Sequence, residues 1–205
     1  MFGHKRNKII YCSLQRSGTK SFGDFLKKNG YKVFSWLDSK AINISHKAAF
    51  GDYREICKIV KRYEAFEDAP FYRIELIKYI YQQFPSSKFV YFERPVEDWY
   101  KSMLSHSNGK TFGDFGRHCE FYNRLDEYLK CHDKTEYLYI EPAKQKYIDA
   151  FYKHQNEIKY LFQNFDQDRV FYGHLYDKNK YYLLASKLKL SLNDLHDVHT
   201  HITEK

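Results

Sequence analysis

The sequence predicts an α/β protein in which a mainly parallel central sheet is flanked by helices. Short segments rich in β-branched and aromatic residues, typical of buried strands, alternate with longer segments whose apolar residues recur at helical spacing. This alternation favours parallel strands joined by helical crossovers. The first strand-like segment also runs into a polar, glycine-containing loop and then a helix, an arrangement suited to anions. We therefore expect a binding site at the carboxyl ends of the strands.

The first half of the chain alternates regularly between strand-like and helix-like segments. The helix after the first strand carries Phe22, Phe25 and Leu26 on one face, and its Lys-Lys-Asn-Gly end is a helix-stop signal. A later helix ends before Pro85, because the residue before a proline disfavours the helical conformation. The elements predicted here are strands over 8–14, 31–37 and 65–70 and helices over 19–30, 50–63 and 71–85.

The second half continues the same pattern. The segment "KFVYFER", residues 88–94, is the clearest strand of the chain, and the next helix opens with Pro95 and acidic residues, which favour a helix N-terminus. Glycines and "SNGK" predict a mobile loop over 105–120. The remaining predicted elements are helices over 115–131, 142–164 and 180–190 and a strand over 168–176. One domain accounts for all of them, with a core over 8–190 and a tail over 191–205.

Composition narrows the class of protein. The chain has 205 residues, 43% of them hydrophobic and 19% aromatic, which is enough to build a core. No apolar run approaches the roughly 20 residues that cross a bilayer, so we expect a cytoplasmic protein without a membrane span. The net charge of +8 indicates an anionic partner, and composition alone does not choose between nucleic acid, an acidic glycan and a phosphorylated cofactor. The basic residues are spread along helical segments and form no block, and nucleic acid is not the partner that we expect. The four cysteines form no CxxC pair and predict neither a disulfide framework nor a metal site.

The loop after the first strand, "SLQRSGTKS", departs from the Walker A pattern of nucleoside triphosphate sites. Gly18 is followed by Thr19, so Lys20 and Ser21 stand one place late, and Ser13 occupies the position of the first glycine. No later apolar strand ends in an aspartate for magnesium. Backbone N–H groups, hydroxyls and the two basic side chains of the loop can nevertheless hold an anion.

Two segments together resemble sulfotransferases that use 3′-phosphoadenosine 5′-phosphosulfate (PAPS). The segment "SLQRSGTKSF" is similar to their 5′-phosphosulfate loop, in which a basic residue precedes Ser/Thr-Gly-Thr. The segment "KFVYFERPVEDWYKS" is similar to their 3′-phosphate signature, whose arginine and serine are here Arg94 and Ser102. The segments 66–91 and 151–176 also resemble compact bacterial-type members. The resemblance implies a three-layer fold of P-loop type and covers most of residues 8–190.

This resemblance also implies a reaction and the residues that serve it. A sulfuryl group would pass from PAPS to a hydroxyl or amine of a small molecule or glycan, leaving adenosine 3′,5′-bisphosphate, with no metal required. Arg16 and Lys20 would stabilise charge on the transferred group. The residues implied to bind the nucleotide are Gln15, Arg16, Ser17, Gly18, Thr19, Lys20, Ser21, Arg94 and Ser102. The Gly-x-x-Gly-x-x-Lys segment of cytosolic members is not found, which leaves the adenosine contacts open.

A general base should accept the proton of the acceptor, and three residues are candidates. Asp68 follows a predicted strand in "FEDAPF", with capping of the next helix as its alternative role. His106 follows Ser102 by about one helical turn, where glycosaminoglycan-type sulfotransferases place a histidine; its alternative is a solvent-facing loop position. His46 lies in the expected acceptor region. His154 corresponds to the histidine position of the family's Tyr-x-x-His motif, but a lone histidine on such a helix is more often packed.

Two other functions stay open on the sequence alone. A small-molecule or nucleotide kinase of P-loop type would need magnesium at the first loop and would bind Mg-ATP. A non-catalytic basic binding module would keep the fold and bind adenosine 3′,5′-bisphosphate without transfer. The identity of the acceptor and the oligomeric state are not determined by the sequence.

Overall fold

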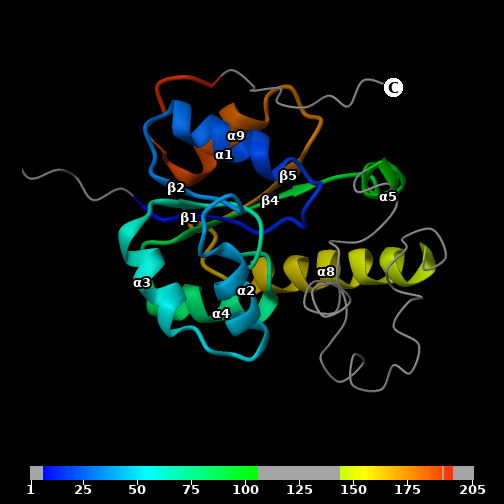
Figure 1. Ribbon diagram of the computed structural model, residues 1–205. Coiled ribbons are helices and arrows are strands. Elements are labelled where there is room, and N and C mark those ends of the chain that lie inside the picture. Colours follow the sequence, from blue (N-terminus) through cyan, green and yellow to red (C-terminus); the bar gives the residue numbers. More distant parts are fainter. Residues whose placement is uncertain (1–6, 106–143, 191, 196–205) are drawn as a thin grey trace, which may run out of the picture.

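A computed structural model describes residues 7–105, 144–190 and 192–195 of the chain. Within these ranges the strands form one sheet in the order β2-β3-β1-β4-β5, and every neighbouring pair is parallel (Figure 1). The strands are β1 (Ile9–Tyr11), β2 (Val33–Phe34), β3 (Ala65–Phe66), β4 (Lys88–Glu93) and β5 (Val170–His174). The predicted α/β fold with its parallel sheet is confirmed.

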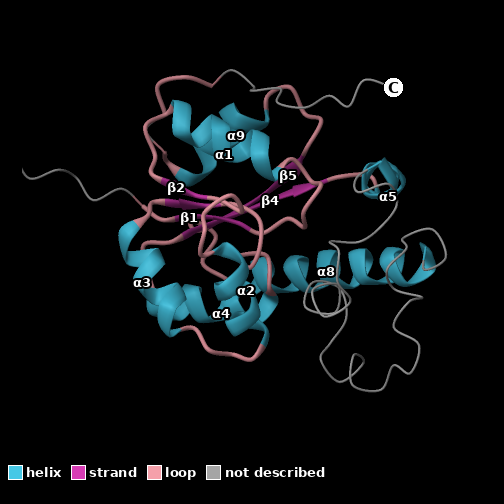
Figure 2. Ribbon diagram, viewed as in Figure 1, coloured by secondary structure: helices cyan, strands magenta, loops and turns pink. Residues whose placement is uncertain are grey.

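Helices cover both faces of the sheet, which gives three layers (Figure 2). One face carries α1 (Thr19–Lys28) and α9 (Lys180–Leu188). The other carries α2 (Ala41–Ala49), α3 (Arg54–Arg62), α4 (Ile74–Gln83) and α8 (Lys144–Asn164). The helix α5 (Val96–Ser105) follows β4 and lies beyond the edge of these layers.

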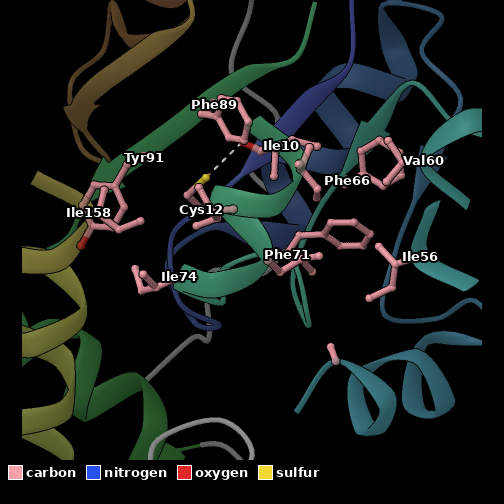
Figure 3. Close-up of a cluster of buried hydrophobic side chains, with 14 of the residues drawn as sticks. Ile10, Cys12, Ile56, Val60, Phe66, Phe71, Ile74, Phe89, Tyr91 and Ile158 are labelled. Atoms are coloured by element: carbon pink, nitrogen blue, oxygen red, sulfur yellow. Dashed lines mark hydrogen bonds between the residues drawn. The ribbon is translucent and has the colours of Figure 1, made fainter. Parts of the chain in front are cut away.

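The central strand β1 and the residue that follows it are buried on both faces of the sheet, because successive side chains of a strand point in opposite directions. Ile10 and Cys12 pack in the core beneath α2, α3, α4 and α8 (Figure 3). Ile9 and Tyr11 pack in the core beneath α1 and α9. The uninterrupted apolar run of the first predicted strand therefore reflects burial on both sides, as in other parallel sheets.

The main difference from the prediction is α2, where the sequence indicated no helix. Its N-cap residue, Lys40, makes no side-chain capping bond, although the Asp38 carboxylate accepts a bond from the Lys40 N–H at 3.1 Å. Burial stabilises it instead, because Ala41, Ile44 and Ala48 lie on one face and pack into the core. Local propensity could not reveal this contribution from tertiary packing.

Two predicted helices begin later than expected. The helix predicted from residue 50 begins at Arg54, where the Asp52 carboxylate accepts a bond from the Arg54 N–H at 3.2 Å. The helix predicted from residue 71 begins at Ile74, because a tight turn comes first, with the Phe71 N–H donating to the Asp68 carbonyl at 3.0 Å. The predicted helix over 115–131 and the loop beyond Ser105 lie outside the described residues.

The end of α1 anchors the chain that follows α9. The Oδ1 of buried Asn29 accepts bonds from the backbone N–H groups of Asn193 and Asp194, both at 2.9 Å. The Nδ2 of Asn29 donates to the Asp194 carbonyl at 2.8 Å, and Lys28 forms an ion pair with the Asp194 carboxylate at 2.6 Å. The described part of the predicted tail, residues 192–195, is thereby tied to α1.

We expect Asn29→Ala to lower the free energy of unfolding by about 2–3 kcal/mol, because it leaves backbone groups of the anchored segment without their partners. Urea denaturation followed by circular dichroism measures this loss. Asn164→Ala is the matched control, since that side chain donates one exposed bond, to the Tyr160 carbonyl at 2.7 Å. A loss no larger than that of the control would contradict the anchoring role of Asn29.

Candidate functional site

The candidate site lies at the topological switch point of the sheet, where the chain passes from one side of β1 to the other. β1 lies between β3 and β4, and α4 carries the chain from one neighbour to the other. The segments that follow these three strands therefore meet beyond their carboxyl ends, which is where open parallel sheets bind ligands. The Ser13 hydroxyl joins the strand ends, donating to the Phe92 carbonyl at 3.1 Å and accepting from the Phe92 N–H at 2.9 Å.

Three side-chain donors fix the loop after β1 by binding its backbone carbonyls. Its consecutive carbonyls are bound by Trp99 Nε1 (to Gln15, 2.9 Å), Arg94 Nη1 (to Arg16) and the Tyr11 hydroxyl (to Ser17). Burial raises the pKa of Tyr11, so its hydroxyl remains a donor at neutral pH. Because these carbonyl oxygens already accept hydrogen bonds, their partial negative charge does not repel an anion bound at the loop.

The backbone of this loop adopts a conformation that side chains rarely permit. Gly18 has φ +80°, and a Cβ there would lie 2.6 Å from Leu175 Cδ1, so the position requires glycine. Arg16 adopts φ +64° despite its side chain, a strained conformation that recurs at functional sites. The first turn of α1 follows directly from Gly18, with no side-chain cap on that residue.

Residues far apart in the sequence form a basic cluster beside the loop. Arg16 Nε donates to Ser102 Oγ at 3.1 Å, and Arg94 Nη1 donates to the Arg16 carbonyl. The Nε of Arg94 is buried and has no hydrogen-bond partner. The amide of Gln15, a buried side chain, likewise has neither of its polar atoms bonded. Two guanidinium groups and unused donors at one place favour a ligand with anionic oxygens.

Asp68 follows β3, which borders β1 on the side opposite to β4. Its Oδ2 accepts a bond from Thr19 Oγ1 at 3.2 Å, and its Oδ1 accepts one from the Ala69 N–H at 2.8 Å. Its φ is +64°, so a second non-glycine residue of the site is strained. The alternative that Asp68 caps the next helix is wrong, because α4 begins at Ile74 with Arg73 as its N-cap.

The sequence analysis missed the neighbouring acid, Glu67. It is only 5% exposed, its Oε2 has no hydrogen-bond partner, and a Cβ on Gly23 of α1 would lie 2.5 Å from its carboxyl group. Burial, with a smaller contribution from the charge of Asp68, raises the pKa of Glu67 to about 8. The sequence shows Glu67 and Asp68 side by side at a strand end, but it does not show that Glu67 is buried.

The other predicted residues fall into three groups. Lys20 is exposed and Ser21 half-buried in the first turn of α1, whereas Ser17 and Thr19 are buried. His106 lies outside the described residues, and the side chain of His46 is not described. His154 is packed, as expected: burial lowers its pKa to about 4, and its Nε2 lies 2.9 Å from the Tyr72 carbonyl oxygen.

The described part of the chain contains neither a grouping of metal-ligating side chains nor a helix suited to span a membrane. In residues 7–105, 144–190 and 192–195, no three histidine, cysteine or acidic side chains are grouped as a metal site would require. Over the same ranges, no helix combines the length and apolar character needed to span a membrane.

Fold and site together define a class: a three-layer α/β protein of P-loop type with a strained, glycine-containing loop between β1 and the start of α1. The model of the sulfotransferase domain family matches residues 8–176, a range that includes this loop, Asp68, Arg94 and Ser102. The chain belongs to the sulfotransferase family, and its general activity is sulfuryl transfer. A comparison with curated proteins found no match.

Proposed function

We propose that this chain transfers a sulfuryl group from PAPS to a hydroxyl or amine of a small molecule or glycan. The observation that carries this proposal is the bond between Arg16 Nε and Ser102 Oγ, next to Arg94, which joins the loop to the second nucleotide segment. A donor with phosphate groups at both ends of its ribose requires two anion sites close together, one at the helix start and one at the paired arginines.

The residues present fit such a donor. The buried and unpaired Arg94 Nε is a charged group that needs a partner, and phosphate oxygens would supply it. The unpaired Gln15 amide and the start of α1 lie on the same loop and offer neutral donors. We assign Arg94 and Ser102 to the 3′-phosphate and residues 15–21 to the 5′-phosphosulfate.

In the proposed mechanism, basic residues of the loop stabilise charge and Asp68 acts as the general base. When bound, PAPS would supply an activated sulfuryl group: the acceptor oxygen or nitrogen would bond to its sulfur while the S–O bond to the 5′-phosphate breaks, and adenosine 3′,5′-bisphosphate would leave. Arg16 and Lys20 stabilise the negative charge on the transferred group and on the leaving oxygen. Asp68 removes the proton from the acceptor, and its bond from Thr19 holds the carboxylate beside the loop.

Calorimetric titration with adenosine 3′,5′-bisphosphate, adenosine 5′-monophosphate and Mg-ATP tests the donor assignment. We expect the bisphosphate to bind the wild type most tightly, and Arg94→Ala to weaken that binding by about tenfold to a hundredfold. Arg62→Ala, which removes an exposed arginine of α3, is the matched control and should leave the affinity unchanged.

The other outcomes of this titration discriminate among functions. Preference for Mg-ATP would replace the proposal with a kinase. Bisphosphate binding with no transfer to any member of a panel of alcohols, phenols, sugars and amines would favour a binding module. Equal binding of the bisphosphate by wild type and Arg94→Ala would remove Arg94 from the nucleotide site.

A further inference from the structure

A polar network joins the end of β4 to α8 and β5, and none of the sequence motifs includes it. The carboxylate of Glu93, the last residue of β4, accepts a bond from Gln155 Nε2 at 2.7 Å and one from the Tyr172 hydroxyl at 2.8 Å. Gln155 is only 5% exposed, and its Nε2 also donates to the Tyr172 hydroxyl at 3.4 Å. Both oxygens of the Glu93 carboxylate are therefore held, each by a donor from a different element.

The sheet places this network on the face of β4 that α8 covers. Side chains two positions apart on a strand share a face, so Glu93 lies on the same side as Tyr91. Tyr91 packs beside Ile158 of α8 (Figure 3). The parallel pairing of β4 with β5 sets Tyr91 opposite Tyr172, and the two rings stack with their centroids 5.0 Å apart. This stacking holds the Tyr172 ring where its hydroxyl reaches the carboxylate.

Arg94 directly follows the residue that this network fixes. The Glu93 carbonyl, which belongs to the peptide leading into Arg94, accepts a bond from the Leu175 N–H at 2.8 Å. On the other side, Pro95 disfavours the helical conformation at Arg94. The backbone is thus restricted on both sides of Arg94, whose Nη1 donates to the Arg16 carbonyl and whose buried Nε has no hydrogen-bond partner.

We propose that Glu93 is a positioning residue through which the site selects nucleotides that carry a 3′-phosphate, with Gln155 and Tyr172 holding its carboxylate. This inference rests on the proposed function, because it assigns Arg94 to that phosphate. The donors of a guanidinium form a rigid planar fork, so its bonds to phosphate oxygens depend on orientation. A rotation of the peptide between Glu93 and Arg94 would turn this fork away from the phosphate.

The charge of Glu93 acts in the opposite direction. A carboxylate near a bound phosphate repels it, so removal of the charge by itself would strengthen the binding of a 3′-phosphate. Loss of the fixed position would weaken that binding. Position and charge therefore predict changes of opposite sign in the same variant.

Titration of Glu93→Ala with adenosine 3′,5′-bisphosphate and adenosine 5′-monophosphate tests the inference. The two ligands differ only in the 3′-phosphate, so the ratio of their affinities isolates its contribution. We expect this ratio to fall about tenfold in Glu93→Ala, with the affinity for the monophosphate unchanged. Glu93→Gln should retain most of the ratio, because its amide has nearly the size of the carboxylate, accepts the bond from Gln155 and donates to the Tyr172 hydroxyl oxygen.

A double-mutant cycle measures whether Gln155 acts through Glu93. Gln155→Leu alone should lower the ratio about threefold to tenfold, and adding it to Glu93→Ala should lower the ratio no further. Gln145→Leu is the matched control, because that exposed glutamine of α8 donates within its own helix, to Asp149 at 2.8 Å. It should leave both affinities unchanged.

Each remaining outcome overturns the inference. An unchanged ratio in Glu93→Ala shows that Glu93 does not act on the phosphate contact. A higher ratio in Glu93→Ala, or an equal loss in Glu93→Gln, shows that charge and not position is responsible. Equal losses for both ligands show a merely structural role, and additive losses in the double variant show that Gln155 does not act through Glu93. If the wild type does not prefer the bisphosphate, the proposed function fails and this inference fails with it; if it does and the ratio is constant across the variants, only the inference fails.

Discussion

Asp68→Asn is expected to lower kcat for sulfuryl transfer by about 10²–10⁴-fold while leaving the affinity for adenosine 3′,5′-bisphosphate nearly unchanged. An amide cannot accept the proton of the acceptor, but it has almost the size of the carboxylate. The Asp68 carboxylate is held by two bonds that it accepts, from Thr19 Oγ1 at 3.2 Å and from the Ala69 N–H at 2.8 Å. The loss should therefore appear in the chemical step and not in nucleotide binding.

Steady-state kinetics with the best acceptor of the panel measure this change, and calorimetry measures the affinity. Asp52→Asn is the matched control, because Asp52 is a surface acid that pairs with Arg54 at 2.8 Å, away from the loop. Retention of kcat in Asp68→Asn would exclude Asp68 as the base and direct attention to His106. A loss of both kcat and nucleotide affinity would mean that Asp68 supports the loop instead of accepting a proton.

Through Glu67 alone, the free energy of unfolding is expected to fall by on the order of 4 kcal/mol as the pH rises from 4.5 to 8. The folded-state pKa of this carboxyl, about 8, lies above its ordinary value of 4.5. A group with a raised pKa binds its proton more tightly in the folded state. Its stabilisation is therefore complete below pH 4.5 and is lost by the time the pH passes 8.

Urea denaturation of wild type and Glu67→Gln at several pH values isolates this contribution from those of other groups. The variant carries no titrating group at this position, so its stability relative to the wild type should increase steadily up to about pH 8. Glu75→Gln, an exposed acid of α4, should follow the wild type at every pH. Parallel curves for wild type and Glu67→Gln would show that Glu67 is ionised in the fold well below pH 8.

The protonated state of Glu67 also bears on the proposed chemistry. Glu67 adjoins Asp68 in the chain, and its carboxyl packs on α1 at Gly23, one turn into the helix that carries Thr19, Lys20 and Ser21. A neutral Glu67 leaves only one carboxylate at this end of β3, beside a loop that must accept an anion. Two ionised acids there would weaken the positive field that the basic residues provide.

Much of the fold could be predicted because its signals are local. The two-sided burial of β1 and β4 shows as continuous apolar runs, and Gly30 marks the end of α1. α2 was not predicted, and it is stabilised by burial of Ala41, Ile44 and Ala48 in the core, which local patterns do not show. α3 and α4 begin at Arg54 and Ile74, a few residues later than predicted, because turns precede them that are visible only in the backbone hydrogen bonds.

The sequence by itself was enough to predict an anion-binding loop after the first strand and a second site residue pair, Arg94 and Ser102, since both predictions rest on short motifs. Only the tertiary structure decided how they combine. Arg16 and Ser102 are 86 positions apart and are brought together because β1 and β4 are neighbours in the sheet. The same sheet order brings β3 beside β1, so that Glu67, at the end of β3, is buried against Gly23 of α1. Burial and charge pairing of this kind depend on distances in space, which a linear pattern does not contain.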